Sequence, residues 1–520
     1  MDQKNLPPSL TRALESLLER RQLVKIAGAL GILAACRDAI VGADRSSLQS
    51  LPSMEGRGQK VIVLGGGLAG LCAAYELDQR GFQVVVLEKT NRVSGRVWTN
   101  YDYFDDGQYC ELGATRIPDC HNLTMGYAQK FGLELAALDY GDEDNTLYYL
   151  DGVKRFKKQT EGAQASSWPE DRGSVESAYT SKGFPLLGDP SVAGWPSKAA
   201  DPQKIAALDA VSFADFLTQI GYSDFARKVV VASNGSEATM YSALLWLAGE
   251  YLEREWNRTN RIKGGNEQLA KGFVGNLSKG SRIELLADVK EVASTKEGVV
   301  VTYRQKGETK QLSAALCVST LPLDVIKKVQ WSPQLSSAKM QASQEVTMQA
   351  VTRINLQFNE RFWEKSVYKL KGLKILHSDL AIERLWDMTG SEDQKYRRGG
   401  PSPLGILTVY IQHENAKKIG SLEPQARIDY ALAQISKVFP EAKATFRKGM
   451  SFVWHKQDWI GGGWSAYRAG QVKLYQATQA QEGNIFFAGD HSSLEPGWIQ
   501  GAFHSAHRVI AEIAQWKKKA

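Results

Sequence analysis

The sequence has little cysteine, and the few cysteines are scattered. Its five cysteines among 520 residues form no CxxC pair and show no spacing typical of a metal site. This pattern excludes a small disulfide-stapled domain and predicts free thiols without a metal centre. Cys110 and Cys120 lie close enough in sequence to pair in an oxidising compartment, and the sequence leaves their state open.

Basic clusters and long apolar runs are also missing. The 64 Lys and Arg residues exceed the 57 Asp and Glu residues by a formal charge of +7, but they form no basic run before Lys517. Nucleic acid is therefore not an expected partner. No apolar run reaches the roughly 20 residues that a membrane-spanning helix needs, so no stable membrane span is predicted.

A short apolar run near the N-terminus bears on localisation. The pair Arg20-Arg21 precedes an apolar run from Ile26 to Cys36, and together they resemble a twin-arginine export signal. In this interpretation residues 1–58 form a leader or arm, and the protein is exported to the periplasm. The alternative is an amphipathic N-terminal helix that packs on the body of a cytoplasmic protein.

The length of the chain requires more than one domain. A chain of 520 residues is beyond the size at which a single core stops growing, so about two or three domains are expected. Residues 61–64 are predicted to form a buried parallel strand, residues 68–80 a helix and residues 84–87 a second strand. These segments predict a right-handed βαβ unit and therefore an α/β fold with a Rossmann-type domain.

Strand and helix patterns continue along the rest of the chain. Further strands are expected at residues 283–286, 298–303, 315–320, 353–358, 406–410, 446–454 and 484–488. Helices are expected within residues 212–251 and at residues 423–438 and 499–516.

A glycine-rich turn joins the first strand to its helix and has the form GxGxxG. The first glycine permits a tight turn, the second lets a pyrophosphate approach the helix N-terminus, and the third lets helix and strand pack closely. Glu88 ends the second strand, where its carboxylate can accept hydrogen bonds from a ribose 2′-hydroxyl. The dinucleotide-binding residues of the turn are expected to be Gly65, Gly67, Leu68, Ala69 and Gly70.

The residues that follow Glu88 resemble the flavin amine oxidase family, whose pattern here is E-x(3)-R-x-G-G-R. The sequence has Arg92 and Arg96 at the arginine positions, but Ser94 replaces the first glycine of the pair. The resemblance implies FAD as the cofactor, with Arg96 near its pyrophosphate and flavin, whereas Arg92 can equally be structural. We expect the loop to tolerate Ser94 because the side chain is small.

Further segments extend the resemblance over nearly the whole chain after the linker. Residues 262–265 and the following Val289 are similar to the returning FAD segment, in which the valine backbone meets the adenine. Gly489 and Asp490 are similar to the C-terminal flavin strand, with aspartate where most members have glutamate. The helix that begins near Ile499 would point its N-terminus at the flavin C2 carbonyl.

The resemblance and the pattern of elements together predict the domain organisation. We expect an FAD-binding Rossmann-type domain, a mixed-sheet substrate domain and a helical insertion. The segments are 59–120, 259–330 and 478–516 for the FAD-binding domain, 121–150 and 331–477 for the substrate domain, and 151–258 for the helical domain. Gly463 stands where monoamine oxidases carry the cysteine that attaches flavin, so the FAD is expected to be non-covalent.

Gly113, Ala114, Thr115 and Arg116 match the family segment that runs past the flavin ring. In the resemblance, an arginine at the last of these positions distinguishes L-amino-acid oxidases from amine oxidases. A guanidinium fork can bind a carboxylate with two hydrogen bonds and thereby fix the Cα–H over flavin N5. The alternative is that Arg116 pairs with a carboxylate of the protein.

Other residues complete the expected substrate site. In the resemblance, the hydroxyl of Tyr410 contacts the substrate carboxylate, the carbonyl of Gly497 accepts from the amine, and Trp464 and Trp498 flank the substrate. Tyr410 and the two tryptophans can equally be core residues. Arg353 stands where members usually place a lysine that holds a water near flavin N5, so an electron acceptor other than oxygen stays an alternative.

These residues predict FAD-dependent oxidative deamination of an L-amino acid. The flavin takes a hydride from Cα, the imino acid hydrolyses to a 2-oxo acid and ammonia, and reoxidation by oxygen gives hydrogen peroxide. The alternatives are a monoamine or polyamine oxidase, a flavin monooxygenase that decarboxylates an amino acid such as tryptophan to an amide, and an inactive flavin-binding scaffold. The expected partners are an L-amino acid, oxygen and a second copy of the chain in a homodimer.

Overall fold

The computed structural model describes residues 51–138, 146–156, 179–192, 195–196, 200–365, 367–370, 374–389 and 402–519. The export signal or helix expected around the Arg20-Arg21 pair lies outside these residues. The described residues divide into two compact units, and the smaller takes those within 166–255 together with 467–472. The larger unit takes the described residues within 48–165, 256–466 and 473–520.

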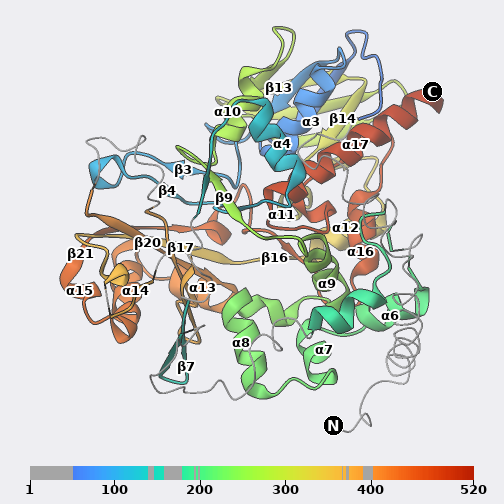
Figure 1. The fold of residues 1–520 in the computed structure, drawn as a ribbon. Helices are drawn as coiled ribbons and strands as arrows, with labels where there is room; N and C mark the ends of the chain where they lie inside the picture. Colours follow the sequence, from blue (N-terminus) through green and yellow to red (C-terminus); the bar gives the residue numbers. More distant parts are fainter. Residues whose placement is uncertain are drawn as a thin grey trace, which may run out of the picture. The chain divides into compact units, whose positions relative to one another are not determined.

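A five-stranded parallel sheet lies in the larger unit (Figure 1). Its order is β10 (Arg282–Glu284), β2 (Gln83–Leu87), β1 (Lys60–Leu64), β14 (Leu316–Ser319) and β23 (Ile485–Phe487). The apolar residues of β1 and β2 are buried, as in a parallel sheet covered on both faces, and this explains their continuous apolar runs. The sheet collects strands from distant parts of the chain.

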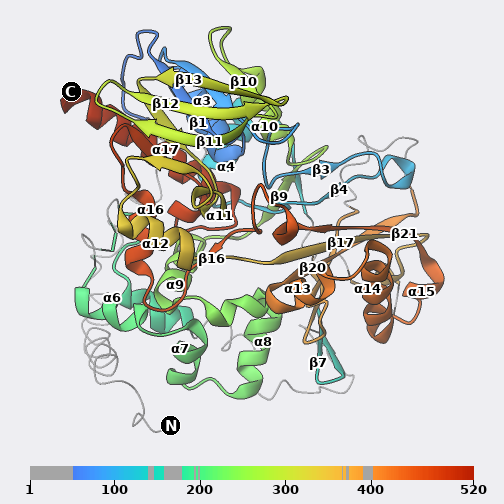
Figure 2. The same ribbon diagram turned by 180° about the vertical axis from the view of Figure 1, so that it is seen from behind.

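Four helices pack together against this sheet and share its hydrophobic core (Figures 1 and 2). They are α3 (Leu68–Asp78), α4 (Asn122–Lys130), α10 (Gln268–Gly275) and α17 (Ile499–Lys519). Leu123 and Tyr127 of α4 lie in this core. Residues 122–130 therefore pack with the five-stranded sheet, whereas the sequence assigned them to the substrate domain.

A four-stranded sheet, β13-β12-β11-β15, also belongs to the larger unit (Figure 2). Its strands are β11 (Asp288–Ser294), β12 (Val299–Gln305), β13 (Glu308–Ala314) and β15 (Gln330–Ser332). The register of β11 against β12 shifts between Val289 and Glu291, which marks a bulge next to the expected adenine-binding valine.

A seven-stranded mixed sheet has the order β21-β17-β20-β19-β18-β7-β8 and takes its strands from residues that the sequence assigned mainly to the substrate domain. Its strands are β7 (Leu147–Leu150), β8 (Val153–Phe156), β17 (Val351–Phe358), β18 (Lys374–Ser378), β19 (Arg384–Asp387), β20 (Gly405–Gln412) and β21 (Phe446–Val453). Helices α13 (His413–Gly420) and α14 (Pro424–Val438) pack against β17. Strands β7 and β8 form a hairpin whose turn residues Asp151 and Gly152 have φ of +52° and +75°. Residues 153–156 thus belong to this sheet rather than to the helical domain.

A two-stranded sheet pairs β16 (Thr347–Met348) with β22 (Ser465–Ala466). Two further small sheets complete the described strands. One pairs β3 (Thr99–Asn100) with β4 (Cys110–Glu111), and the other has the order β5-β9-β6. The strands of the second are β5 (Ile117–Pro118), β6 (Leu135–Ala137) and β9 (Thr259–Ile262).

The smaller unit is helical in its described part. Its α-helices include α6 (Pro202–Asp209), α7 (Phe213–Gln219), α8 (Asp224–Asn234) and α9 (Ala243–Leu252). Ser212, Ser223 and Ser242 cap the last three of these, because each side chain accepts a hydrogen bond from a backbone N–H of the first turn.

Two further expectations concern the pairing of Cys110 with Cys120 and the absence of a membrane span. Cys72, Cys110 and Cys317 are buried free thiols, so Cys110 and Cys120 form no disulfide with each other. Among the described residues, no helix is both long and apolar enough to cross a membrane.

Candidate functional site

The glycine-rich turn and Glu88 meet where β1 and β2 end. The Gly66 N–H donates to Glu88 Oε2 at 2.7 Å, and Thr90 donates to Oε1 from its backbone N–H and its hydroxyl, each at 2.8 Å. A Cβ on Gly70 would lie 2.0 Å from the Gly65 carbonyl oxygen, so only glycine permits this packing. The turn and its buried carboxylate therefore have the geometry of a dinucleotide site.

Gly67, just before α3, has open space beside its backbone. A Cβ on Gly67 would have no described heavy atom within 4 Å except the Cα of Gly95, 3.9 Å away. The peptide groups at the helix N-terminus can thus approach a pyrophosphate closely. The Ala287 N–H donates to the Glu88 carbonyl at 2.8 Å, so the segment that leads to Val289 lies beside Glu88.

Ser94 lies on the loop that faces the glycine turn, and its backbone is left-handed with φ of +84°. Its N–H donates to the Gly66 carbonyl at 2.8 Å, so the loop keeps its contact with the turn. The buried Ser94 hydroxyl makes no hydrogen bond with the described residues. Backbone geometry explains why the family pattern has glycine here, since a non-glycine residue at positive φ costs on the order of 1–3 kcal/mol.

The two arginines of the same loop have different roles. Arg92 donates to the carbonyls of Val93 at 3.0 Å and Gly95 at 2.6 Å, so it stabilises its own loop. Arg96 instead pairs with Asp490 and donates to the Gly463 carbonyl at 3.0 Å, so it joins its loop to two distant segments. The structure thus brings together Arg96 and Asp490, two residues expected near the flavin.

Asp490 is held as a charged group despite its burial. Burial alone would raise the pKa of the Asp490 carboxyl, but the charge and hydrogen bond of Arg96 outweigh burial and lower the pKa overall. The other carboxylate oxygen accepts from the Ser465 N–H at 3.2 Å. The shorter side chain at this position is therefore engaged by the protein on both oxygens.

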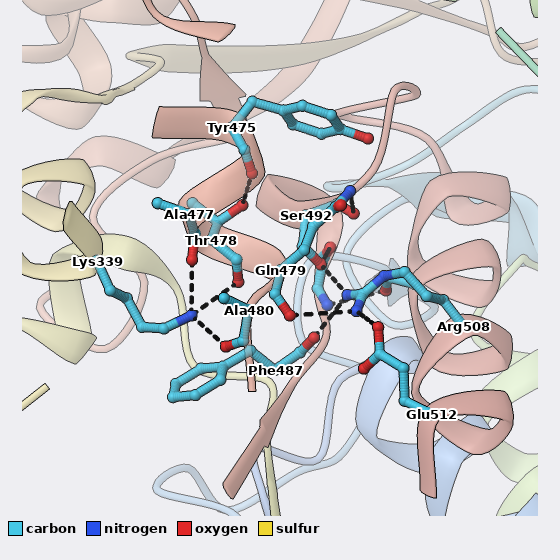
Figure 3. A network of polar contacts seen from close by, with 12 residues as sticks. Lys339, Tyr475, Ala477, Thr478, Gln479, Ala480, Phe487, Ser492, Arg508 and Glu512 are labelled. Atoms are coloured by element: carbon cyan, nitrogen blue, oxygen red, sulfur yellow. Dashed lines mark hydrogen bonds and ion pairs between the residues drawn. The ribbon is translucent and has the colours of Figure 1, made fainter. Parts of the chain in front are cut away.

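A network of buried polar side chains fixes the segment around Asp490 (Figure 3). Lys339 of α12 (Ser337–Glu345) donates to the carbonyls of Ala477 and Ala480, each at 2.8 Å, where α16 (Val472–Gln479) ends. Its Nζ also lies 3.7 Å from the ring centroid of Phe487 in β23. Arg508 of α17 donates to the Phe487 carbonyl at 2.6 Å. These contacts fix β23 and the residues that follow it.

Arg353 contacts the residues that precede Arg116 in the chain. Its Nη1 donates to the carbonyls of Glu111 at 3.2 Å and Gly113 at 2.5 Å, and to the Thr115 hydroxyl at 2.5 Å. The guanidinium is buried and lies 4.6 Å from the ring centroid of Tyr410, its cross-strand partner. Arg353 therefore positions the backbone of this segment.

Two further buried side chains hold the same segment, and sequence reasoning missed both. Asn266 Nδ2 donates to the carbonyls of Ala114 at 3.1 Å and Thr115 at 3.0 Å. Trp454 Nε1 donates to the Leu112 carbonyl at 2.8 Å. Every carbonyl from residue 111 to residue 115 is thus bonded by a side chain from a distant segment.

The segment also approaches the Arg96 loop closely. A Cβ on Gly113 would lie 1.9 Å from the Arg96 carbonyl oxygen, and the Ala114 N–H donates to that oxygen at 3.1 Å. The neighbouring Glu111 is fully buried, and burial raises the pKa of its carboxyl to about 7. A half-neutral carboxyl limits the negative charge next to the arginines.

The residues expected at the substrate site lie near one another in the structure. Its Cζ lies 4.9 Å from the ring centroid of Trp498, which immediately precedes α17. A Cβ on Gly497 would lie 3.2 Å from the Trp464 ring, so glycine is required for this approach. The rings of Trp464 and Tyr410 lie 6.3 Å apart. Contacts thus run from Arg116 to Trp498, and from the adjacent Gly497 through Trp464 to Tyr410.

Known proteins resemble this chain over most of its length. The model of the flavin containing amine oxidoreductase family matches residues 68–514. The Bacillus subtilis (strain 168) protein named "Putative L-amino-acid oxidase YobN" is 27% identical over 87% of this chain and 94% of its own length. The Demansia vestigiata L-amino-acid oxidase is 24% identical over 89% of this chain and 88% of its own length.

A solved structure shares the fold. Cyclohexylamine oxidase from Brevibacterium oxydans IH-35A superposes with a TM-score of 0.73 at 20% identity, covering 89% of this chain and 100% of its own. At this identity the likeness concerns the fold alone.

Proposed function

We propose that this chain, which belongs to the flavin-containing amine oxidoreductase family, is an L-amino-acid oxidase that binds FAD non-covalently. The observation that carries the proposal is the placement of Arg116 beside Trp498, at the end of a segment whose carbonyls are all held by buried side chains. A guanidinium held in this way is preorganised for a carboxylate, which a simple amine lacks. The names of the relatives from Bacillus subtilis and Demansia vestigiata support the same activity.

In this proposal each residue has one task. Arg116 binds the substrate carboxylate, the Tyr410 hydroxyl makes a second contact with it, and the Gly497 carbonyl accepts from the amine. Trp464 and Trp498 enclose the substrate and exclude water. When bound, FAD supplies the acceptor for the hydride that leaves Cα, and oxygen is the proposed final acceptor.

Product analysis tests the activity. Holoenzyme supplied with each common L-amino acid in air is expected to give a 2-oxo acid, ammonia and hydrogen peroxide in equal amounts with at least one of them. An amide as product would instead establish oxidative decarboxylation, and turnover of amines alone to aldehydes would establish an amine oxidase. Anaerobic bleaching of the flavin by an amino acid without peroxide formation in air would show that oxygen is not the acceptor.

Acid precipitation tests the mode of cofactor binding. Position 463 has no thiol, and a Cβ there would lie 2.6 Å from Val351 Cγ2. Trichloroacetic acid is therefore expected to release all of the yellow colour into the supernatant, where chromatography against standards identifies it as FAD. Flavin that stays with the protein pellet would contradict non-covalent binding, and FMN in the supernatant would contradict the assignment of FAD.

A further inference from the structure

Three indole rings surround the guanidinium of Arg116. Its Cζ lies 4.9 Å from the ring centroids of both Trp386 and Trp498 and 5.4 Å from that of Trp256. Trp386 comes from β19, Trp256 from the segment before β9, and Trp498 from the residue before α17. Three distant parts of the chain thus converge on one charged side chain.

The rings are also held by one another and by their neighbours. The rings of Trp256 and Trp498 meet edge-on, with centroids 5.6 Å apart and an interplanar angle of 90°. The ring centroids of Trp386 and Tyr410 lie 4.7 Å apart. His121 meets Trp498 edge-on at 4.9 Å, and burial lowers the pKa of this histidine to about 4. His121 is therefore neutral around pH 7 and adds no positive charge beside Arg116. Each ring is fixed by a second aromatic contact.

Indole rings can orient a guanidinium because of its charge and its planar shape. The planar group is attracted through its charge to the faces of aromatic rings, whereas its N–H donors point outward in the plane. Aromatic contacts can therefore orient the group without using the donors that a carboxylate needs. A flexible side chain gains most from such support, because its orientation is otherwise lost to rotamer entropy.

We propose that Trp256 and Trp386 form, with Trp498, an indole cage that fixes Arg116 and so determines how strongly the enzyme prefers an α-amino acid to the corresponding amine. This inference rests on the proposed role of Arg116 in binding the carboxylate. Trp256 and Trp386 are positioning residues, because they act through Arg116. Neither was identified from the sequence.

Substitutions of the two cage residues test the proposal. Trp386→Leu and Trp256→Leu each remove an aromatic face, whereas Trp386→Phe and Trp256→Phe keep one. We expect each leucine variant to lower the ratio of kcat/KM for the amino acid to that for the decarboxylated amine roughly 5- to 30-fold, mainly through KM. The phenylalanine variants should retain most of the ratio.

Binding of benzoate provides a measurement that is independent of turnover. This carboxylate has no oxidisable Cα–H, and its binding is followed by the change in flavin absorbance of the oxidised holoenzyme. Its Kd should rise in the leucine variants by about the same roughly 5- to 30-fold factor. Trp516→Leu is the matched control, since Trp516 meets Phe486 edge-on near the end of α17, away from the cage. It should leave both the ratio and the Kd unchanged.

The outcomes separate this inference from the proposed function. Leucine variants that retain FAD and keep the parental substrate ratio and benzoate Kd would overturn the cage, and so would equal loss on both substrates. Because the two variants lie on different segments, unfolding of one leaves the other to decide. If Arg116→Met abolishes the preference for amino acids while the tryptophan variants keep it, the cage is wrong but the role of Arg116 in binding the carboxylate stands. Unchanged kinetics in Arg116→Met would overturn the proposed role of Arg116, whereas the activity itself is decided by the products.

Discussion

Replacing Arg116 with methionine is expected to lower kcat/KM for the best L-amino acid roughly 30- to 1000-fold. Methionine keeps much of the apolar length of the side chain but cannot donate charge-assisted hydrogen bonds to a carboxylate. Those bonds contribute on the order of 2–4 kcal/mol in a partly desolvated site. The decarboxylated amine should lose much less activity because it has no carboxylate to bind. Steady-state kinetics on both substrates measure the difference.

The control variant is Arg304→Met, which removes an exposed arginine from β12 in the four-stranded sheet. It should behave as the parent enzyme in both assays. The flavin content of each variant is measured in parallel. Equal loss on both substrates with FAD retained would indicate damage at the flavin and count against a carboxylate-specific role for Arg116.

Asn266→Asp is expected to be the most damaging single substitution of the site. It replaces the amide that donates to the Ala114 and Thr115 carbonyls with a carboxylate of almost the same shape. The side chain is fully buried and close to the carboxyl of Glu111, whose oxygen accepts from the Asn266 N–H at 2.8 Å. An uncompensated buried charge facing two carbonyl oxygens costs on the order of 3–5 kcal/mol. Loss of bound FAD and a lower thermal unfolding midpoint should follow.

The matched control is Asn276→Asp, ten residues along the chain at the exposed end of α10. There the amide donates to the Gly272 carbonyl at 2.8 Å but faces solvent, so the new carboxylate stays hydrated. Differential scanning fluorimetry and flavin content compare the two variants. Equal midpoints and equal FAD content would show that the Asn266 amide does not hold the segment.

The parts of the site that were predicted from sequence are encoded locally. The family and the α/β fold class are confirmed. The turn at Gly65–Gly70 and the carboxylate of Glu88 belong to one βαβ unit, so short-range spacing is enough to place them together. Arg116 was found in the same way, as part of a continuous motif.

The residues that were missed depend on long-range pairing. Asn266 reaches Thr115 across 151 residues, and Trp454 reaches Leu112 across 342. No local pattern predicts such contacts, although Asn266 directly follows residues 262–265, the segment that resembles the family. Trp386 lies in the four-residue strand β19, too short for a clear alternation. By contrast, the Asp151-Gly152 turn between Leu147–Leu150 and Val153–Phe156 is a local hairpin signal that the domain assignment overlooked.

The order of strands in the five-stranded sheet has a consequence for how the chain is made. Val61 of β1 pairs with Leu316 of β14, and Cys317 of the same strand pairs with Ile485 of β23. During synthesis the first βαβ unit leaves the ribosome long before its neighbours exist, and contacts this distant in sequence form slowly. Asp490 and the helix α17 follow β23 in the chain. The five-stranded sheet therefore cannot be completed until β23 has been made, and a chain truncated before β23 would hold the glycine-rich turn on an incomplete sheet.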